Sequence, residues 1–331
     1  LWPFASGWII GLACLADRAG LLVSLVDRRA RGATAALLAG VFAGMFAVRL
    51  DWVLEDVAQS SSGIDRQQVA LGHWAKEHLP AGARIGVNDT GAIAYFGEKK
   101  TFDVVGLTTP TEGRYWVAGA ASRLEHYERL LVSSPSSLPT HFIVYPEWMA
   151  LEPVLGRALH EAVVTDSTIL GGQTMRASEA RWDHLGTGER PWTTLSTIHD
   201  ELDVADLESE AAHGYELLGA REGEQAAHEG NAPDGAIVLD GGRTNRSTDR
   251  FFVKLPAEGA LVGVARVEAS AKTALRVSVG GKPVARIDVL DGPWVEVTFA
   301  IPPDARGERT EIEVSADGPR FASFHYWFGA P

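Results

Sequence analysis

The chain has 331 residues, a formal net charge of −13 and a sequence pI near 5.2. This length allows two or three domains, and the acidic balance argues against binding to nucleic acid, or to anionic lipid through the soluble part. The only cysteine is Cys14, which excludes a disulfide, a thiolate metal site and cysteine catalysis in the residues that follow it.

Two apolar segments at the start of the sequence predict membrane-spanning helices, and we assign residues 1–56 to them. The first fills residues 1–26 and is interrupted by Asp17 and Arg18, and the second runs through residues 33–54. A helix spans a bilayer with about 20 apolar residues. The first segment lacks the basic region and cleavage site of a signal peptide. We therefore expect two spans that belong to the C-terminal part of a longer polytopic protein.

Charges on either side of the second segment predict its orientation. Arg28, Arg29 and Arg31 precede it, and Glu55 and Asp56 follow it. Short basic loops are retained in the cytoplasm. The sequence thus predicts a protein of the bacterial inner (cytoplasmic) membrane that contacts the bilayer through its first helices. Everything after these helices is expected on the periplasmic, or extracytoplasmic, side.

Residues 57–192 alternate helix-like and strand-like segments, which is the pattern of a small α/β domain. We expect helices at residues 67–78, 92–96, 122–132 and 147–160, and strands at residues 84–88, 101–105, 141–145, 162–169 and 174–177. This alternation predicts a mainly parallel sheet covered by helices. A ligand of such a sheet lies near the carboxyl ends of its strands.

Residues 193–234 differ from the preceding domain because acidic side chains dominate part of them. The acidic run consists of Asp200, Glu201, Asp203, Asp206, Glu208 and Glu210. Several carboxylates together could bind calcium, but this run lacks the glycine-centred spacing of a calcium loop. Charge runs are usually solvated. We therefore expect an acidic region that connects two domains.

Residues 235–331 have an all-β pattern. Strands are expected at residues 236–239, 251–255, 261–268, 274–279, 283–289, 295–301, 310–315 and 321–328. Turn signals separate these strands, and Gly280-Gly281 is a strong hairpin signal. Residues 295–299 alternate apolar and polar side chains, as a half-buried strand does. Short strands at nearly regular spacing predict a jelly-roll-like β-sandwich.

One motif of the α/β domain resembles a known family. It runs Arg84-Ile85-Gly86-Val87-Asn88-Asp89-Thr90-Gly91-Ala92-Ile93-Ala94-Tyr95-Phe96 and leads into Thr101-Phe102-Asp103-Val104-Val105-Gly106-Leu107-Thr108. Together with the helix that ends before Pro80, this segment is similar to the extracytoplasmic region of bacterial GT-C type membrane glycosyltransferases. The resemblance extends over residues 33–185 and leaves out the β-sandwich.

The resemblance implies that the chain is the C-terminal portion of an integral-membrane glycosyltransferase. Such an enzyme transfers a sugar from a polyprenyl-phosphate donor to an acceptor in the cell envelope. The family's catalytic acid lies in an earlier outer loop, so no catalytic role passes to residues of this chain, and the lipid-linked donor is the only implied cofactor. The outer domains would assist recognition of a glycan or glycolipid acceptor. The alternative is a non-catalytic, membrane-tethered carbohydrate-binding or assembly module.

Four residues near predicted strand ends are candidates for a polar pocket. Asp89 and Asp103 could form a carboxylate pair for acid–base work, with Asn88 and Tyr95 lining the same pocket. The competing interpretation is structural. Asp89 would then cap the helix that follows it, and Asp103 would hold a turn.

The last predicted strand is aromatic on both faces, which makes Tyr326 and Trp327 candidates for carbohydrate binding. One face must pack inside the sandwich, and the other could stack on sugar rings. The competing interpretation is that sheet partners or a neighbouring domain bury both faces. We expect no metal site, because His73 and His78 lie on different sides of a predicted helix and no other histidines cluster at metal-binding spacing.

Overall fold

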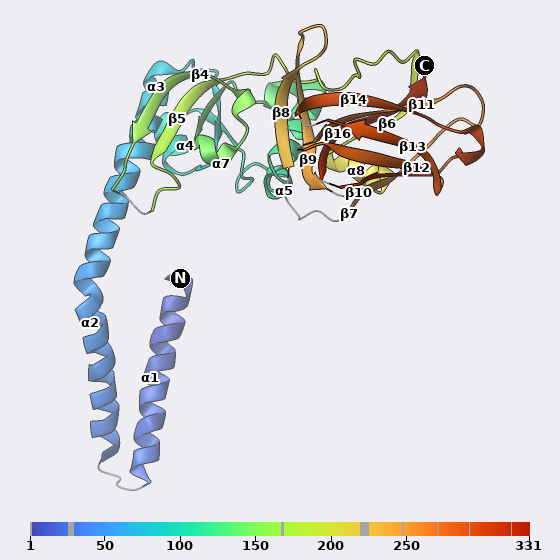
Figure 1. The fold of residues 1–331 in the computed structure, drawn as a ribbon. Helices are drawn as coiled ribbons and strands as arrows, with labels where there is room; N and C mark the ends of the chain where they lie inside the picture. Colours follow the sequence, from blue (N-terminus) through green and yellow to red (C-terminus); the bar gives the residue numbers. More distant parts are fainter. Residues whose placement is uncertain are drawn as a thin grey trace. The chain divides into compact units, whose positions relative to one another are not determined.

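The computed structural model of the chain divides it into two compact units. The described residues are 2–25, 30–166, 169–218, 225–246, 248–269, 271–290, 292–318 and 320–331. One unit consists of Leu1–Asp65 with Thr165–Leu170, and the other of Arg66–Val164 with Gly171–Pro331. Figure 1 shows the helices and strands of both.

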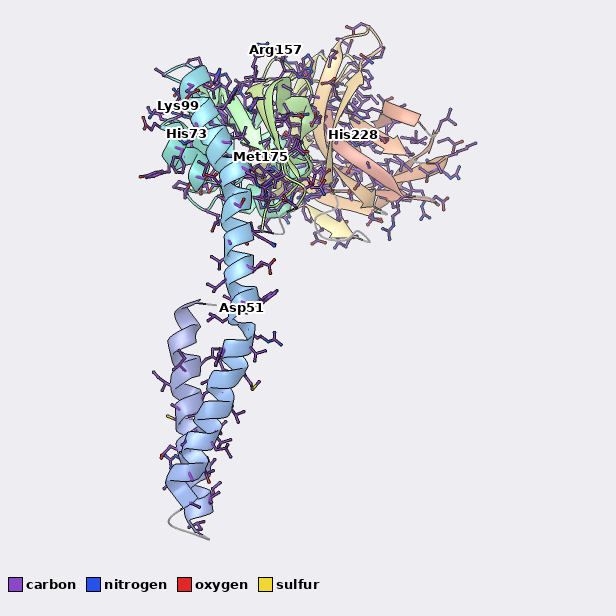
Figure 2. The ribbon with its side chains drawn as sticks, turned by 90° about the vertical axis from the view of Figure 1, so that its left-hand side faces the viewer. Asp51, His73, Lys99, Arg157, Met175 and His228 are labelled. Atoms are coloured by element: carbon purple, nitrogen blue, oxygen red, sulfur yellow. The ribbon has the colours of Figure 1, made fainter. Side chains whose placement is uncertain are left out.

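The first unit is a pair of antiparallel helices. α1 (Trp2–Ser24) and α2 (Ala30–Ile64) run side by side, and Figures 1 and 2 show the pair from two directions. The two predicted spans therefore correspond to two helices. The predicted basic connection between them, with Arg28 and Arg29, lies outside the described residues.

Large apolar side chains cover the outside of α2. Leu37, Phe46 and Val48 are each more than half exposed. Among the described residues, one helical stretch, Gly32–His78, is long and apolar enough to cross a membrane, and its apolar window is not buried at all. α1 does not meet the same criterion.

The second unit begins with a change of helical geometry. A π-helical turn, η1 (Asp65–Val69), leads into α3 (Ala70–His78). π-turns are rare and often found at functional positions. Here the turn places Gln67 and Gln68 in buried positions.

The sheet of the α/β part is mixed rather than mainly parallel. Its order is β2 (Lys100–Asp103), β1 (Arg84–Val87), β3 (His141–Val144), β5 (Thr174–Ala180) and β4 (Leu155–Val163). β1 pairs in parallel with β2 and β3, whereas β5 pairs antiparallel with β3 and β4. The prediction of a parallel sheet therefore holds only around β1.

The difference between the predicted and the observed sheet arises at residues 147–160, where a helix was predicted. Instead the chain forms a single turn α7 (Pro146–Met149), a 3₁₀ turn η3 (Glu152–Val154) and then β4. Pro153 lacks the amide hydrogen that a helix interior needs, so the helix cannot continue. The strand that follows forms an antiparallel pair with β5 in place of a crossover.

Helices pack around this sheet. They are α4 (Ala92–Gly97), α5 (Glu112–Ala118), α6 (Ala120–Ser133) and the 3₁₀ turn η2 (Pro135–Ser137). α6 is amphipathic, because Leu124 and Tyr127 enter the core of the α/β part while Glu125 and Glu128 leave the helix in another direction. The same core includes Leu239 from a sandwich strand, so the α/β part and the sandwich share one compact unit.

The C-terminal part is the expected β-sandwich. One sheet has the order β13 (Lys282–Val289), β12 (Thr273–Val279), β15 (Thr310–Ala316), β10 (Thr248–Val253) and β7 (Glu216–Leu218). The other has the order β14 (Gly292–Ala300), β11 (Val262–Ala269), β16 (Phe321–Ala330), β9 (Ile237–Arg246) and β8 (Gln225–Asn231). Each of the strands predicted from residue 236 onward is present. A 3₁₀ turn, η4 (Pro303–Ala305), precedes β15.

Residues 193–234 are not a connection between domains. They contribute β6 (Thr197–Asp203), which pairs with β16, then α8 (Leu207–His213), and then β7 and β8 of the two sheets. β9 pairs with the first part of β16, at Phe321 and Ser323, and β6 with the second part, from His325 onward. The acidic run therefore lies within the folded sandwich.

Candidate functional site

Asp103 holds a turn, as the structural interpretation predicts. Its side chain is fully buried, and Oδ1 accepts hydrogen bonds from the amides of Val105 at 3.0 Å and Gly106 at 3.1 Å. Oδ2 accepts from the amide of Thr108 at 2.6 Å. Gly106 has φ +86°, and a Cβ there would lie 2.0 Å from the amide nitrogen of Gly113. Because both oxygens stabilise this loop, Asp103 is not placed for acid–base work.

Asp89 and its neighbours do not form the predicted pocket. The N-cap of α4 is Gly91, without a side-chain cap, so the predicted capping role of Asp89 is wrong. Instead Oδ2 of Asp89 accepts a hydrogen bond from Nε2 of Gln68 at 2.5 Å. Asn88 is buried and faces the amide of Tyr145. Tyr95 points away, with 78% of its surface exposed.

Tyr326 and Trp327 are both fully buried, which agrees with burial rather than sugar stacking. The hydroxyl of Tyr326 donates to Oδ2 of Asp249 at 2.6 Å, inside the sandwich. On the other face of β16, Nε1 of Trp327 donates to the carbonyl of Glu189 at 3.1 Å. The segment around Glu189 therefore covers this outer face and keeps solvent from it.

A row of charged and polar side chains crosses four neighbouring strands on that covered face. Asp203 of β6 is paired with His325 of β16, His325 with Arg266 of β11, and Arg266 with Glu296 of β14. Side chains at paired positions lie close together on one face of a sheet. The register of the sheet thus brings together groups that are far apart in the sequence.

Arg266 fastens the covering segment to the sheet. Its side chain is fully buried; Nη1 donates to Oδ2 of Asp240 at 2.6 Å and to the carbonyl of Gly188 at 2.7 Å. Nη2 donates to Oε1 of Glu296 at 2.9 Å and to the carbonyl of Arg190 at 3.0 Å. The guanidinium also lies over the ring of Trp327, 4.8 Å from its centre. These bonds supply the partners that a buried charge requires.

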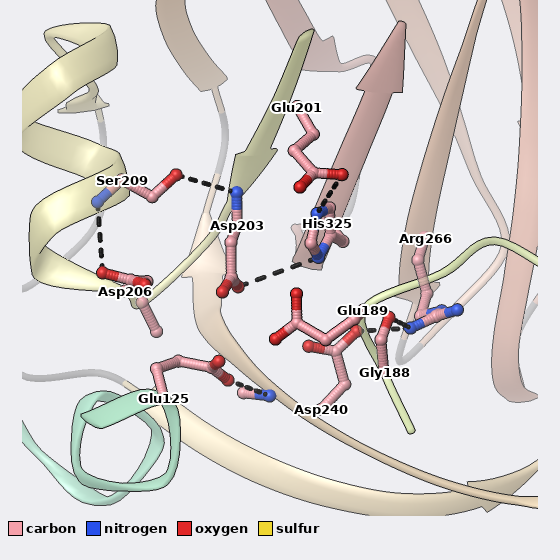
Figure 3. Close-up of polar contacts among 12 residues, drawn as sticks. Glu125, Gly188, Glu189, Glu201, Asp203, Asp206, Ser209, Asp240, Arg266 and His325 are labelled. Atoms are coloured by element: carbon pink, nitrogen blue, oxygen red, sulfur yellow. Dashed lines mark hydrogen bonds and ion pairs between the residues drawn. The ribbon is translucent and has the colours of Figure 1, made fainter. Parts of the chain in front are cut away.

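Acidic side chains from four parts of the chain meet beside this row, and we call them the carboxylate cluster: Glu125, Glu128, Glu189, Asp203 and Asp240. Figure 3 shows the carboxylates of Glu189, Asp203 and Asp240 turned towards one another near His325. Glu125 reaches the cluster from α6, and its Oε1 accepts from the amide of Gly241 at 2.7 Å. A Cβ at that glycine would lie 2.2 Å from the same oxygen, so the close approach needs glycine.

Burial and mutual repulsion shift the titration of this cluster. The pKa of Asp203 is raised well above its ordinary value, mainly by burial and secondly by the charge of Asp240. Burial, and next the charge of Asp203, does the same to the pKa of Glu125. Burial raises the pKa of Asp240 to about 7, although Arg266 opposes this. The pKa of His325 is held well below its ordinary value by burial and by the charge of Arg266.

The carboxylate cluster opens into a cavity of about 1090 Å³, which we call the acidic groove. Its lining comes from α6, the segment 185–189, β6 and α8, and includes Glu128, Glu189 and Asp203 of the cluster. Strongly perturbed carboxylates in a concave site are a physical sign of a functional site.

The α8 side of the groove is built by the acidic run itself. Asp206 is the N-cap of α8, where its Oδ1 accepts from the amides of Glu208 at 2.8 Å and Ser209 at 3.1 Å. Its other oxygen accepts from Arg129 of α6. The run therefore ends β6 and begins α8, and Asp206 is buried rather than solvated.

His213 closes the same side. Its Nδ1 donates to the carbonyl of Ser209 at 2.7 Å, and its Nε2 lies 3.2 Å from Oδ1 of Asp200. Burial opposes its charged form, but these hydrogen bonds outweigh burial and raise the pKa of His213. The sequence prediction missed His325, Asp240 and Glu125 as site residues. The one available signal was the acidic run, which supplies Asp203.

A family model described as a domain of unknown function (DUF8728) matches residues 58–200, which cover the α/β part and most of β6. No curated protein matches the chain.

Several solved structures can be aligned with part of this chain. One is a carbohydrate-binding module of Cellvibrio mixtus lichenase 5A in complex with cellotriose, with 12% identity, 41% of this chain and 99% of that chain covered, and a TM-score of 0.27. Another, from Clostridium stercorarium with cellobiose, has 15% identity, coverages of 40% and 94%, and a TM-score of 0.26. A Bacillus subtilis arabinoxylan arabinofuranohydrolase has 14% identity, coverages of 53% and 33%, and a TM-score of 0.27. These scores are too low to establish a shared fold.

Proposed function

We propose that this chain is a membrane-anchored protein of the bacterial cell envelope that binds a neutral glycan in its acidic groove. The observation that carries this proposal is the groove, a cavity of about 1090 Å³ whose lining is rich in hydrogen-bond acceptors. Cavities at this scale are large enough to enclose an organic ligand.

The chemistry of the lining favours a ligand with many hydroxyl groups. Ionised carboxylates accept hydrogen bonds and cannot donate them. Oε2 of Glu208 is buried at the groove without a hydrogen-bond partner among the described residues, and Glu201 lines the same groove. Sugar hydroxyls donate and accept. An anionic ligand would be repelled by the same carboxylates. Val132, 88% exposed, and Leu131 add an apolar surface for the C–H faces of a sugar ring.

The first unit supports a location at a membrane. Apolar side chains such as Leu37, Phe46 and Val48 are exposed on α2, and exposing a side chain of this kind to water instead of burying it costs about 1.5–3 kcal/mol. A bilayer removes that cost. The basic residues before α2 favour the orientation that carries the second unit out of the cytoplasm. Glycans of the envelope are the carbohydrate available there.

We extend the proposal to a glycosyltransferase of GT-C type, of which this chain would be the C-terminal portion. In support, the motif that carries the resemblance forms β1, α4 and β2, and Asp103 gives its last element a defined loop. The groove would then select the acceptor glycan, and the polyprenyl-phosphate donor would bind elsewhere. Further spans and an early outer-loop acid in the complete open reading frame would support this extension. Their absence would leave a tethered binding module.

The glycan proposal is tested by blocking the groove with a tryptophan. Ala212 lies on the groove side of α8, and its neighbour Ala211 is exposed without lining the groove. The full chain in lipid nanodiscs is screened against oligosaccharides of bacterial envelopes. For each one that binds, we expect Ala212→Trp to weaken binding at least about tenfold, equivalent to about 1.4 kcal/mol.

The matched control is Ala211→Trp, for which we expect affinity within about twofold of the wild type. Equal weakening by both variants, or the absence of any binding oligosaccharide in the screen, contradicts the proposal. The orientation is tested separately with a reporter enzyme fused after Asp56. A reporter active only in the cytosol would remove the argument for envelope glycans.

A further inference from the structure

The carboxylate cluster and His325, beside the acidic groove, include side chains of the kind that hold a divalent cation. Ligand atoms of Asp203, Asp240 and His325 lie within 4.8 Å of one another, and those of Glu125, Glu189 and Asp203 do likewise. Two ligands on opposite sides of a metal ion, each bonded at about 2.0–2.6 Å, are about 4–5 Å apart. The spacing in this cluster therefore suits an ion placed between the ligands.

Two buried atoms, one in the carboxylate cluster and one in the neighbouring His325, have no hydrogen-bond partner among the described residues. They are Oδ1 of Asp203 and Nε2 of His325, and His325 is only 1% exposed. Nδ1 of His325 faces Oδ1 of Asp203 at 3.8 Å, which is too long for a hydrogen bond. Buried polar atoms are normally satisfied, and an exception requires an explanation. An ion bound to Asp203 Oδ1 and His325 Nδ1 would provide one for Asp203.

The local charge balance points to a cation. Arg266 contacts the cluster through Asp240, and it divides its charge between Asp240 and Glu296. Its contacts do not extend to Glu125, Glu189 or Asp203 in the described structure. Carboxylates packed together in a low-dielectric interior repel one another strongly unless a positive charge lies among them.

We propose that Asp203, Asp240 and His325 bind a divalent metal ion, Zn²⁺ or Mn²⁺, with Glu189 as a further carboxylate ligand. Imidazole suits zinc and other transition metals, whereas carboxylates suit manganese, calcium and magnesium. Calcium and magnesium prefer shells made only of oxygen. A histidine among carboxylates therefore selects the transition metals that accept both nitrogen and oxygen.

The surroundings of His325 fit a metal ligand. If Nδ1 carries the metal, the neutral ring has its proton on Nε2, and Oε2 of Glu201 lies 3.9 Å from Nε2. At this distance Glu201 faces Nε2 without forming a hydrogen bond to it. The ring is stacked on that of Trp327, with centres 4.1 Å apart and planes 4° from parallel. Asp203 and Glu189 line the groove, so an ion has a path of entry.

This inference goes beyond the proposed glycan binding and does not rest on it, because all the ligands come from this chain. It also replaces the sequence-based expectation of no metal site, which considered only histidines or carboxylates close together in the sequence. An ion beside the groove would present its open positions to whatever the groove holds.

The test is a titration of the full chain in lipid nanodiscs, with no carbohydrate present. The protein is treated with a chelator and then titrated separately with Zn²⁺, Mn²⁺, Ca²⁺ and Mg²⁺ in a calorimeter. We expect one equivalent of Zn²⁺ or Mn²⁺ per chain, bound at least about tenfold more tightly than Ca²⁺ or Mg²⁺. Asp203→Asn and His325→Gln should each weaken binding at least about a hundredfold.

Two controls separate loss of the site from loss of the fold. Asp183→Asn and His228→Gln change the same residue types at positions outside the cluster, and both should bind the metal as the wild type does. Thermal unfolding of metal-free Asp203→Asn should occur at or above the wild-type temperature, because an amide of the same shape replaces a carboxyl group that is buried among other carboxyl groups. Added metal should then raise the unfolding temperature of the wild type and of both control variants, but not that of Asp203→Asn.

Wild-type protein that binds none of the four ions overturns the proposal. So does Asp203→Asn that binds Zn²⁺ or Mn²⁺ as tightly as the wild type, and so does a preference for Ca²⁺ or Mg²⁺. Because no sugar enters the titration, its failure leaves the glycan proposal standing, and a failure of the glycan screen leaves the metal site standing.

Discussion

At the central strands β16 and β11, both faces of the six-stranded sheet are buried, but they are built from opposite chemistry. On β16, Tyr326 and Phe328 enter the apolar core of the sandwich, while His325 and Trp327 face the covering segment. β11 behaves in the same way, with Ala265 in the core and its neighbour Arg266 among carboxylates. Strict alternation along a strand makes this division possible.

The inner face of the sheet therefore contributes mainly to stability, and the outer face provides polar groups for binding. The inner face is stabilised by the removal of apolar surface from water, a term that needs no special geometry. The outer face carries buried charges, and such charges rarely add net stability compared with apolar residues of similar size. A polar face that remains buried at that cost is consistent with a role in binding.

Removing an inner aromatic side chain should have the largest effect on folding. Phe328→Ala leaves a cavity in the core, and we expect the free energy of unfolding to fall by about 3–5 kcal/mol. Urea denaturation of the full chain in nanodiscs, followed by tryptophan fluorescence, measures the change. A loss below about 1 kcal/mol would mean that the inner face is not the main source of stability.

Arg266→Met should have the next largest effect, at about 3 kcal/mol, because it leaves Asp240 and Glu296 buried without their cation. The methionine keeps most of the apolar volume, so the loss reports on charge. The same denaturation experiment checks it. The double change of Arg266→Met with Glu296→Gln should recover part of the loss, and a greater loss in the double variant would contradict the comparison.

His213→Gln should have the smallest effect, about 1 kcal/mol, and it should depend on pH. The pKa of His213 is raised in the folded chain by its bonds to Asp200 and Ser209. Its contribution is therefore fully present below the ordinary histidine pKa and is lost as pH rises through the raised value. Unfolding measured at about pH 5.5 and about pH 8.5 should show the wild-type advantage only at the lower pH. An equal difference at both pH values would argue against a charged His213.

Local sequence patterns predicted the strands of the sandwich well. Turn signals such as Gly280-Gly281 and the alternation at residues 295–299 are local, and they placed β12, β13 and β14 correctly. The mixed sheet was missed, because its antiparallel half follows from Pro153 ending a helical pattern and from β4 pairing with β5.

The candidate site was largely beyond the reach of the sequence. Asp203, Asp240 and His325 come together only through the register of β6, β9 and β16. The acidic run was expected to be solvated because nothing local shows that α6 and the segment 185–189 will cover it. Burial of one face of a sheet by a segment that is distant in the sequence depends on the tertiary structure. This burial sets the environment of every residue in the cluster.

The position of β16 has a consequence for how the protein matures. This strand follows all the other sandwich strands in the sequence, yet it lies between β11, β9 and β6. The sheet therefore cannot close until Phe321–Ala330 has been synthesised. Long-range pairings of this kind slow folding, and they leave strand edges unpaired until the last strand is added. If the second unit is exported, it crosses the membrane with an incomplete sheet. A chaperone that covers unpaired β-strand edges would then protect it until the sheet closes.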